Sequence, residues 1–240
     1  MKILGVDTSS GCLSVALVED GRLTGLCSRD DGLGHSVNLM PMIAAMLDAR
    51  GLNPGHIDLF AVATGPGSFT GLRIGAAAVK GMALAADKPC AGVSTLEALA
   101  QAFGRGRGLV CPVMDARRSE MYNAVFDAGS GARLRPDRAL SLDALYEDLK
   151  PLSINGNIIY LVGDGAEICY NFLVEKGLTA DIFFAPPHIR MSAAYGVAAA
   201  GQRMFERGQA VDAARLAINY LRLPQAERER REKLTNGEIQ

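Results

Sequence analysis

Several residue types and patterns are scarce or missing in this chain of 240 residues. Tryptophan is absent and aromatic residues make up 6% of the sequence, which argues against a platform on which nucleic-acid bases stack. The formal net charge is −1, whereas proteins that bind nucleic acid unaided usually carry a basic excess. No apolar run reaches the roughly 18 residues of a transmembrane helix, so we expect no membrane span.

Cysteine and histidine are also sparse, which bounds the redox and metal chemistry. The 5 cysteines form no C-x-x-C pair, a pattern typical of reduced thiols in a cytoplasmic protein: Cys12, Cys27, Cys90, Cys111 and Cys169. The opening MKILGVDTSS is interrupted too early to be a signal peptide. The 3 histidines, His35, His56 and His188, are too far apart to form a local metal motif. No G-x-S-x-G elbow occurs. We therefore predict no metal site and no catalytic residue.

What is present is a repeated order of elements in a chain that is 49% apolar. Alternating apolar runs and turn residues predict the order βββαβαβα twice. In the first repeat we expect strands within 3–7, 12–19 and 21–28, a helix at 37–50, a strand at 57–63, a helix at 70–86, a strand at 90–93 and a helix from 94. In the second we expect strands within 109–127 and at 132–140. A helix at 141–149, a strand at 157–162, a helix at 166–175, a strand at 182–185 and a helix at 192–207 then follow. Strands alternating with helices predict mixed sheets covered on both faces.

The repeat predicts two units, residues 1–103 and 108–240, separated by the glycine-rich stretch GRGRG. We expect the tail from about residue 218 to pack back on the first unit. The tail's sequence PQAERERREK alternates in charge, which is typical of a solvated segment. A minor contact of its arginines with tRNA or a partner is the alternative.

A duplicated βββαβαβα unit resembles the plan of the actin-like, sugar-kinase and Hsp70 ATPase superfamily. In that superfamily each half offers a turn to the phosphates of a nucleotide, with an aspartate at the strand end. The resemblance suggests a vestigial nucleotide cleft formed by Asp7, Thr8, Ser9, Asp115, Arg117, Gly163 and Gly165. The alternative is that these residues are ordinary turn formers. The resemblance leaves open whether ATP or ADP binds there or at an interface; we expect no other cofactor.

The stretch TGPGSFTGLRIG, residues 64–75, follows an apolar strand and opens a helix, the usual place for a phosphate loop. It contains no Gly-Lys-Ser/Thr, so it is not a Walker A loop. The glycine at position 71 falls one place late for a dinucleotide fingerprint. We favour a tight turn with a helix cap at Ser68 or Thr70, and we read the helical glycines as sites of close backbone approach. Ligand contact is the alternative.

Six stretches are much more specific: VDTSSGCLSVAL, HSVNLMPMI, TGPGSFTGLRIGAAAVKGMA, GVSTLEALA, MDARRSEMYNAVF and NYLRLPQAER. In this order they resemble the bacterial TsaB family, also called YeaZ, over nearly the whole chain. The resemblance implies a part in making threonylcarbamoyladenosine at position 37 of tRNAs that read ANN codons. There a catalytic paralog, TsaD, transfers the threonylcarbamoyl group from threonylcarbamoyl-AMP. TsaB is its scaffold, and a small ATPase, TsaE, joins the complex; tRNA contact would be indirect.

The catalytic paralog carries a metal-binding H-x-x-x-H after the strand that follows the glycine-rich helix. The corresponding segment here, GVSTLEALA at 92–100, has no histidine. The resemblance therefore implies a subunit that is neither the transferase nor a metalloprotease. The rival interpretation is a self-sufficient ATP-dependent enzyme, such as a kinase, with Asp7, Asp115 and the turn at 163–165 in its site.

The helix expected at 37–50 is apolar around nearly its whole circumference, which indicates burial on two sides. One side would be the sheet and the other a partner, with methionines as an adaptable surface. Together with the small-residue helix at 70–86, the resemblance implies a surface that binds the paralog and can pair with itself. The predicted interface residues are Leu39, Met40, Met42, Ile43, Met46, Leu47, Gly71, Ile74, Gly75, Ala78 and Met82. The alternative is a thick core.

Overall fold

The computed structural model describes residues 1–222, apart from 33, 155, 179–180 and 187–192. It contains two sheets of five strands each. The first has the order β3-β2-β1-β4-β5, with β1 (Lys2–Asp7), β2 (Leu13–Glu19), β3 (Arg22–Arg29), β4 (Leu59–Gly65) and β5 (Cys90–Ser94). The second has the order β10-β9-β6-β7-β8, with β6 (Leu109–Asp115), β7 (Glu120–Asp127), β8 (Arg133–Ser141), β9 (Ile159–Val162) and β10 (Ile182–Phe184). The two orders are equivalent, so the predicted duplication is confirmed.

The described helices follow the predicted order. They are α1 (His35–Asp48), α2 (Phe69–Ala86), α3 (Thr95–Phe103), α4 (Leu142–Ile154), α5 (Ala166–Glu175) and α7 (Ala194–Glu206), with short 3₁₀ turns at Pro54–His56 and Ala213–Arg215. Local signals set many of the boundaries. Asp20 and Gly21, with φ of 49° and 76°, form the tight turn between β2 and β3. Each of three serines at helix starts accepts a 3.2 Å hydrogen bond from the amide three residues on: Ser68, Ser94 and Ser141.

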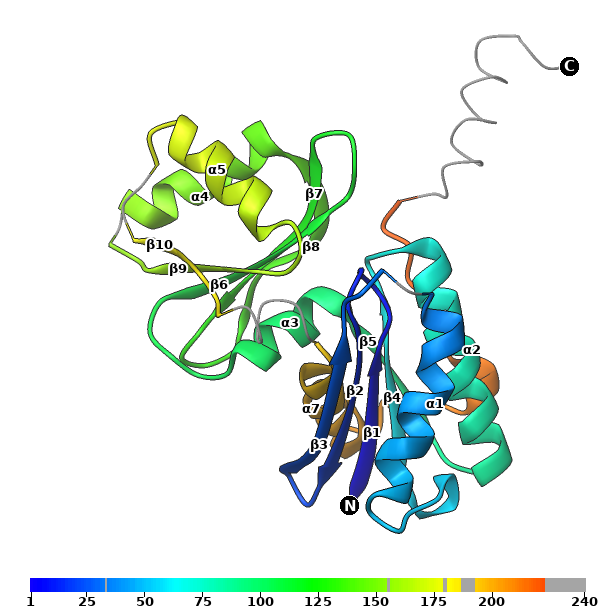
Figure 1. Ribbon diagram of the computed structural model, residues 1–240. Coiled ribbons are helices and arrows are strands. Elements are labelled where there is room, and N and C mark those ends of the chain that lie inside the picture. Colours follow the sequence, from blue (N-terminus) through cyan, green and yellow to red (C-terminus); the bar gives the residue numbers. More distant parts are fainter. Residues whose placement is uncertain (33, 155, 179–180, 187–192, 223–240) are drawn as a thin grey trace, which may run out of the picture.

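The helices cover both faces of the first sheet. Figure 1 shows α1 and α2 on one face and α7 on the other, while α4 and α5 cover the outer face of the second sheet. Strands β1 and β4 are buried along nearly their whole length, because helices shield both of their faces. Helix α3 lies between the halves, where it packs against α7 and against β6 and β7 of the second sheet.

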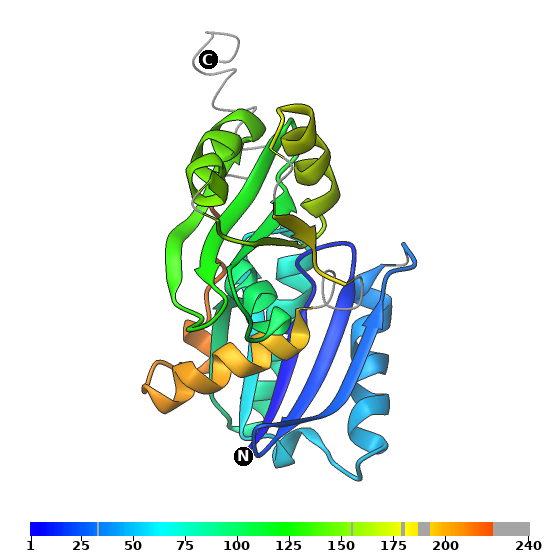
Figure 2. The same cartoon turned by 90° about the vertical axis from the view of Figure 1, so that its left-hand side faces the viewer.

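Helix α7 follows the second sheet in the chain but packs on the first, as Figure 2 shows. The sequence placed it in the unit 108–240, because its own residues do not indicate which sheet it covers. Its small residues explain why it packs on the first sheet. A Cβ on Gly196 would lie 1.8 Å from the carbonyl oxygen of Ala98, and one on Gly201 would lie 2.6 Å from the Cβ of Ala61. The helix therefore lies too close to α3 and β4 for larger side chains at these positions.

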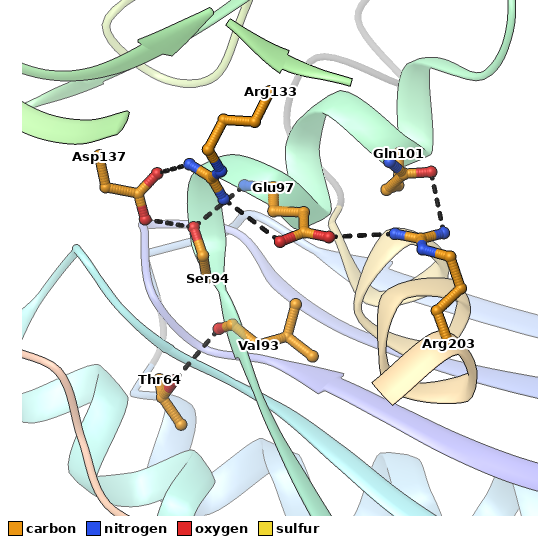
Figure 3. Close-up of polar contacts among 8 residues, drawn as sticks. All are labelled: Thr64, Val93, Ser94, Glu97, Gln101, Arg133, Asp137 and Arg203. Atoms are coloured by element: carbon orange, nitrogen blue, oxygen red, sulfur yellow. Dashed lines mark hydrogen bonds and ion pairs between the residues drawn. The ribbon is translucent and has the colours of Figure 1, made fainter. Parts of the chain in front are cut away.

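A polar network at the start of α3 joins the halves (Figure 3). Ser94 Oγ donates a 2.5 Å hydrogen bond to Asp137 of β8. The carboxylate of Glu97 accepts from Arg133 of β8 at 3.2 Å and from Arg203 of α7 at 3.1 Å. Arg133 also pairs with Asp137. Elements of both halves and the returning helix thus meet around one carboxylate.

Candidate functional site

Three of the predicted turn residues, Ser9, Asp115 and Arg117, line a cleft between the two halves. The cavity there has a volume of about 450 Å³. The first half contributes the β1–β2 turn with Ser9 and the glycine-rich loop with Gly67. The second half contributes the β6–β7 turn, with Asp115 and Arg117, and Asp164 of the turn before α5. The sequence therefore identified the segments that line the cleft, although it did not fix their distances.

The two halves repeat the same hydrogen-bonded turn. Asp7 Oδ1 accepts from the amide of Ser9 at 2.9 Å, and Asp115 Oδ1 accepts from the amide of Arg117 at 2.7 Å. Each is an aspartate at a strand end that binds the backbone two residues on. The amide of Asp115 in turn donates to Asp164 Oδ1 at 3.2 Å. The duplication thus extends to individual hydrogen bonds.

Two of the carboxyl groups in the cleft are strongly desolvated. Burial raises the pKa of Asp7, and the hydrogen bonds from Ser9 offset part of this effect. Burial also raises the pKa of Asp164, and the charges of Asp115 and Asp7 raise it further, against a backbone hydrogen bond from Asp115. These groups disfavour a second negative charge nearby, so a phosphate would need compensating cations or backbone amides.

A second, much smaller cavity of about 10 Å³ lies beside these aspartates, large enough for about one water molecule. Asp7 and Asp164 line it together with Thr95 and Leu99. Thr95 and Leu99 are four residues apart on α3, within the segment that lacks the H-x-x-x-H. Neither side chain is an ordinary metal ligand. Among the described residues, no group of three or more His, Cys, Asp and Glu side chains could hold a metal ion.

The glycine-rich loop is held against the β1–β2 turn. The amide of Ser68 donates to the carbonyl of Ser9 at 2.7 Å, and Thr8 Oγ1 donates to the carbonyl of Gly71 at 2.7 Å. A Cβ on Gly71 would lie 2.0 Å from the carbonyl oxygen of Thr8, and one on Gly75 would lie 2.4 Å from Thr8 Oγ1. The close approach that these glycines allow is therefore internal. The expectation that they admit a partner helix is wrong, because the β1–β2 turn already fills that space.

Other predicted interface residues are also interior. Leu39, Ile43, Leu47 and Met82 belong to the core between the first sheet and its helices. Met42, Met46, Ile74 and Ala78 are half-buried against this core, and Met40 is 47% exposed. The sequence could not separate these groups, because a helix that is apolar all round gives no phase from which to find its outer face.

The exposed residues of these two helices include small and apolar ones that sequence reasoning mostly missed. We call this set the α1–α2 surface, and it comprises Val37, Met40 and Ala44 of α1 and Ala77, Gly81 and Leu84 of α2, all exposed. Val37 is 73% and Leu84 76% exposed. A Cβ on Gly81 would meet no atom within 4 Å. The spacing of three and four residues on each helix was the available signal.

The remaining predicted residues of the cleft have structural tasks. Gly163 has φ of 107°, and a Cβ there would lie 2.3 Å from the carbonyl oxygen of Val113. A Cβ on Gly165 would lie 2.9 Å from the sulfur of Met121. These two glycines let the turn before α5 lie against the end of β6. Sequence reasoning missed four cleft-lining residues near the end of the described chain: Asn219, Tyr220, Leu221 and Arg222.

Two of the histidines act locally. The Nε2 atom of His35 lies 2.8 Å from the carbonyl oxygen of Ser10. The Nδ1 atom of His56 accepts a 3.1 Å hydrogen bond from the amide of Asn53, which caps a 3₁₀ turn. His188 lies outside the described residues. Within the described part of the chain no helix is long and apolar enough to cross a membrane.

Comparison with known proteins accounts for this architecture. Residues 32–134 match the family model of TsaD, tRNA N6-adenosine threonylcarbamoyltransferase. Two solved structures share the fold at low sequence identity. The activator of 2-hydroxyisocaproyl-CoA dehydratase from Clostridium difficile has a TM-score of 0.54 and 11% identity, over 87% of this chain and 97% of that one. The ROK hexokinase from Thermus thermophilus has a TM-score of 0.50 and 13% identity, over 86% of this chain and 100% of that one. The predicted actin-like, sugar-kinase fold is confirmed.

Closer relatives identify the family. YeaZ from Pseudomonas aeruginosa has a TM-score of 0.74 and 26% identity, over 92% of this chain and 99% of that one. The tRNA threonylcarbamoyladenosine biosynthesis protein TsaB of Escherichia coli (strain K12) is 32% identical over 230 residues, which are 92% of this chain and 95% of that protein. This chain therefore belongs to the TsaB (YeaZ) family of tRNA threonylcarbamoyladenosine biosynthesis proteins.

Proposed function

We propose that this chain is a non-catalytic subunit that binds a TsaD-like transferase through the α1–α2 surface and thereby supports the modification of adenosine 37 in tRNA. A TsaE-like ATPase would join through the complex, and tRNA would be contacted only indirectly, in keeping with the net charge of −1. The observation that carries the proposal is the exposed apolar face of α1 and α2, which lies within residues 32–134, the part that matches the transferase model.

The composition of this surface suits helix-to-helix docking. Leu84 and Val37 are large apolar side chains left largely in solvent, and clusters of this kind on one face mark interaction sites. Beside them Ala77 and Gly81 present almost no side chain, so a facing helix could approach closely. Met40 adds a flexible side chain that adapts to the partner's shape.

The kind of partner follows from the family match. A transferase that shares the pattern of residues 32–134 would carry equivalents of α1 and α2. Two such surfaces can pair around a local two-fold axis, because each face is complementary to a near copy of itself. The same reasoning allows two copies of this chain to form a homodimer, which would compete with the transferase for the surface.

The side chains around Asp7 and Asp164 support a non-catalytic role. Thr95 and Leu99 occupy the only turn of α3 that lines the small cavity, and threonine and leucine rarely bind metals. We assign the chemistry of threonylcarbamoyl transfer to the partner. The rival kinase-like function would require a nucleotide to bind in the cleft of about 450 Å³. The side chains of Tyr220 and Arg222 also line that cleft.

The test is binding and modification with purified components from the same organism. Leu84→Glu and Gly81→Arg place charges on the α1–α2 surface, where burial at an interface should cost about 2 kcal/mol or more and weaken binding at least ~30-fold. Ile168→Glu is the matched control, because Ile168 is 45% exposed on α5 of the other half.

Threonylcarbamoyladenosine formation should fall with Leu84→Glu and Gly81→Arg but not with Ile168→Glu. Undiminished binding by both surface variants, with the chain folded, would contradict the proposed surface. Asp7→Ala combined with Asp115→Ala should leave modification intact. Loss of modification in a folded double variant, or ATP turnover by the isolated chain, would favour the kinase-like alternative.

A further inference from the structure

The chain returns to the cleft after α7 along the edge of the first sheet. Val211 and Cys90 of β5 exchange two backbone hydrogen bonds, of 2.7 and 2.8 Å. Leu216 is 4% exposed and packs over Gly92, where an added Cβ would lie 3.0 Å from its Cδ1. The amide of Asn219 then donates to the carbonyl of Thr64 at 2.8 Å. This path brings residues 219–222 to the glycine-rich loop.

Residues 219–220 are fitted to that loop. Gly65 has φ of 123°, and a Cβ there would lie 2.2 Å from the carbonyl oxygen of Asn219. The ring of Tyr220 packs on that of Phe69, with centroids 4.9 Å apart. The hydroxyl of Tyr220 accepts a 3.1 Å hydrogen bond from Nε of Arg73, whose guanidinium also lies over the Phe69 ring. The segment is therefore anchored to the first half by backbone, ring and hydroxyl contacts.

Two residues further on, the segment reaches the second half. The guanidinium of Arg222 donates a 2.9 Å hydrogen bond to the carbonyl of Ala116 in the β6–β7 turn and pairs with the carboxylate of Glu120. The side chain of Arg222 is 18% exposed and that of Glu120 is 37% exposed, so the arginine is largely shielded from solvent while the carboxylate is not. Residues 219–222, which we call the C-terminal strap, thus contact both halves and line the cavity between them.

We propose that the C-terminal strap fastens the two halves across the cleft and controls access to it. Proteins of two halves around a cleft open by rotation about the connecting elements. Here the network around Glu97 joins the halves at α3, and the strap joins them at the cavity, from the glycine-rich loop and α2 to the β6–β7 turn. With both ties in place the halves cannot separate. Release of the strap would let the halves move apart and expose the β1–β2 and β6–β7 turns together, because both turns line the same cavity as the strap.

The test compares hydrogen exchange in the full chain and in variants of the strap. Tyr220→Ala removes the ring and hydroxyl contacts with the first half, and Arg222→Ala removes the contacts with the second. Each substitution should cost at least about the free energy of one ordinary hydrogen bond. The double variant should therefore open the cleft at least ~10-fold more often. Amide exchange should then speed up ~10-fold in peptides from both turns, while peptides from α1 keep their protection. Arg207→Ala, an exposed arginine at the end of α7, is the matched control.

Faster exchange in both turns of the double variant, with Arg207→Ala like wild type, supports the strap. Wild-type protection of both turns in the double variant overturns it. Exchange that rises throughout the chain would report general destabilisation. For that case Tyr220→Phe and Glu120→Gln remove only the hydroxyl contact and the charge pair, and unchanged turn protection in both would also overturn the proposal. None of these outcomes depends on the α1–α2 surface, so the experiment tests the strap independently of the proposed function.

Discussion

The glycines of α2 allow a sharp test of what the glycine-rich segment does. Gly71 and Gly81 lie in the same helix, but their surroundings are opposite. A methyl group on Gly71 would lie 2.0 Å from a backbone oxygen of Thr8, whereas one on Gly81 would meet nothing within 4 Å. We therefore expect Gly71→Ala and Gly81→Ala to change stability in opposite directions.

The magnitudes follow from packing and helix propensity. Alanine in an open, interior helical position gains about 0.5–1 kcal/mol over glycine, so Gly81→Ala should raise the melting temperature by about 1–4 °C. Gly71→Ala gains less, because it lies in the first turn. The clash can be relieved only by moving the β1–β2 turn or the helix, since the obstructing atom belongs to the backbone. Overpacking of this kind costs about 1–3 kcal/mol, so the melting temperature should fall by about 2–12 °C.

The measurement is thermal and urea unfolding of both variants beside wild type. Gly81→Ala is the internal control, because it makes the same chemical change in the same helix. If Gly71→Ala is as stable as wild type, the close packing of α2 on the β1–β2 turn is wrong. The glycine would then be free for a ligand or a partner, as one of the sequence-based interpretations held.

Further predictions concern the buried groups and the network at α3. Because burial raises the pKa of Asp7, its charge destabilises the folded state at neutral pH, and this cost fades as the pH falls toward about 4. The stability of Asp7→Asn relative to wild type should therefore be most favourable at pH 7 and shrink in acid, and a gap that does not depend on pH would contradict this. Burial raises the pKa of the Cys111 thiol to about 12 and also raises that of Cys169, whereas Cys27 is exposed. A thiol reagent should accordingly label Cys27 rapidly in the native protein and the other two only on unfolding. Arg203→Ala should lower the free energy of unfolding by no more than about 1 kcal/mol in urea titrations, because the ion pair is about one-third exposed; a larger loss would mean that solvent screens the network less than we infer.

Part of the fold could be predicted because its causes are local. The turn at Asp20 and the serine caps depend on residues one to three positions away, so the sequence alone identifies them. Sheet periodicity and the recurrence of an aspartate at a strand end gave the duplication and the segments of the cleft. Family resemblance then supplied the assignment to threonylcarbamoyladenosine biosynthesis, which the comparisons support.

The sequence by itself thus determined the order of the elements, the two-fold repeat, several segments of the cleft and the family. Only the tertiary structure decided which surfaces those elements bury. In the structure Gly71 packs against Thr8 rather than facing a partner, and α7 packs on the first sheet. Leu84 is left in solvent, and Arg222 contacts Ala116 across the cleft. The physical reason is range. Caps, turns and periodicity are set within a few residues, whereas the face that a helix buries depends on contacts between distant segments, such as that of Ser14 with Ala194, 180 residues apart.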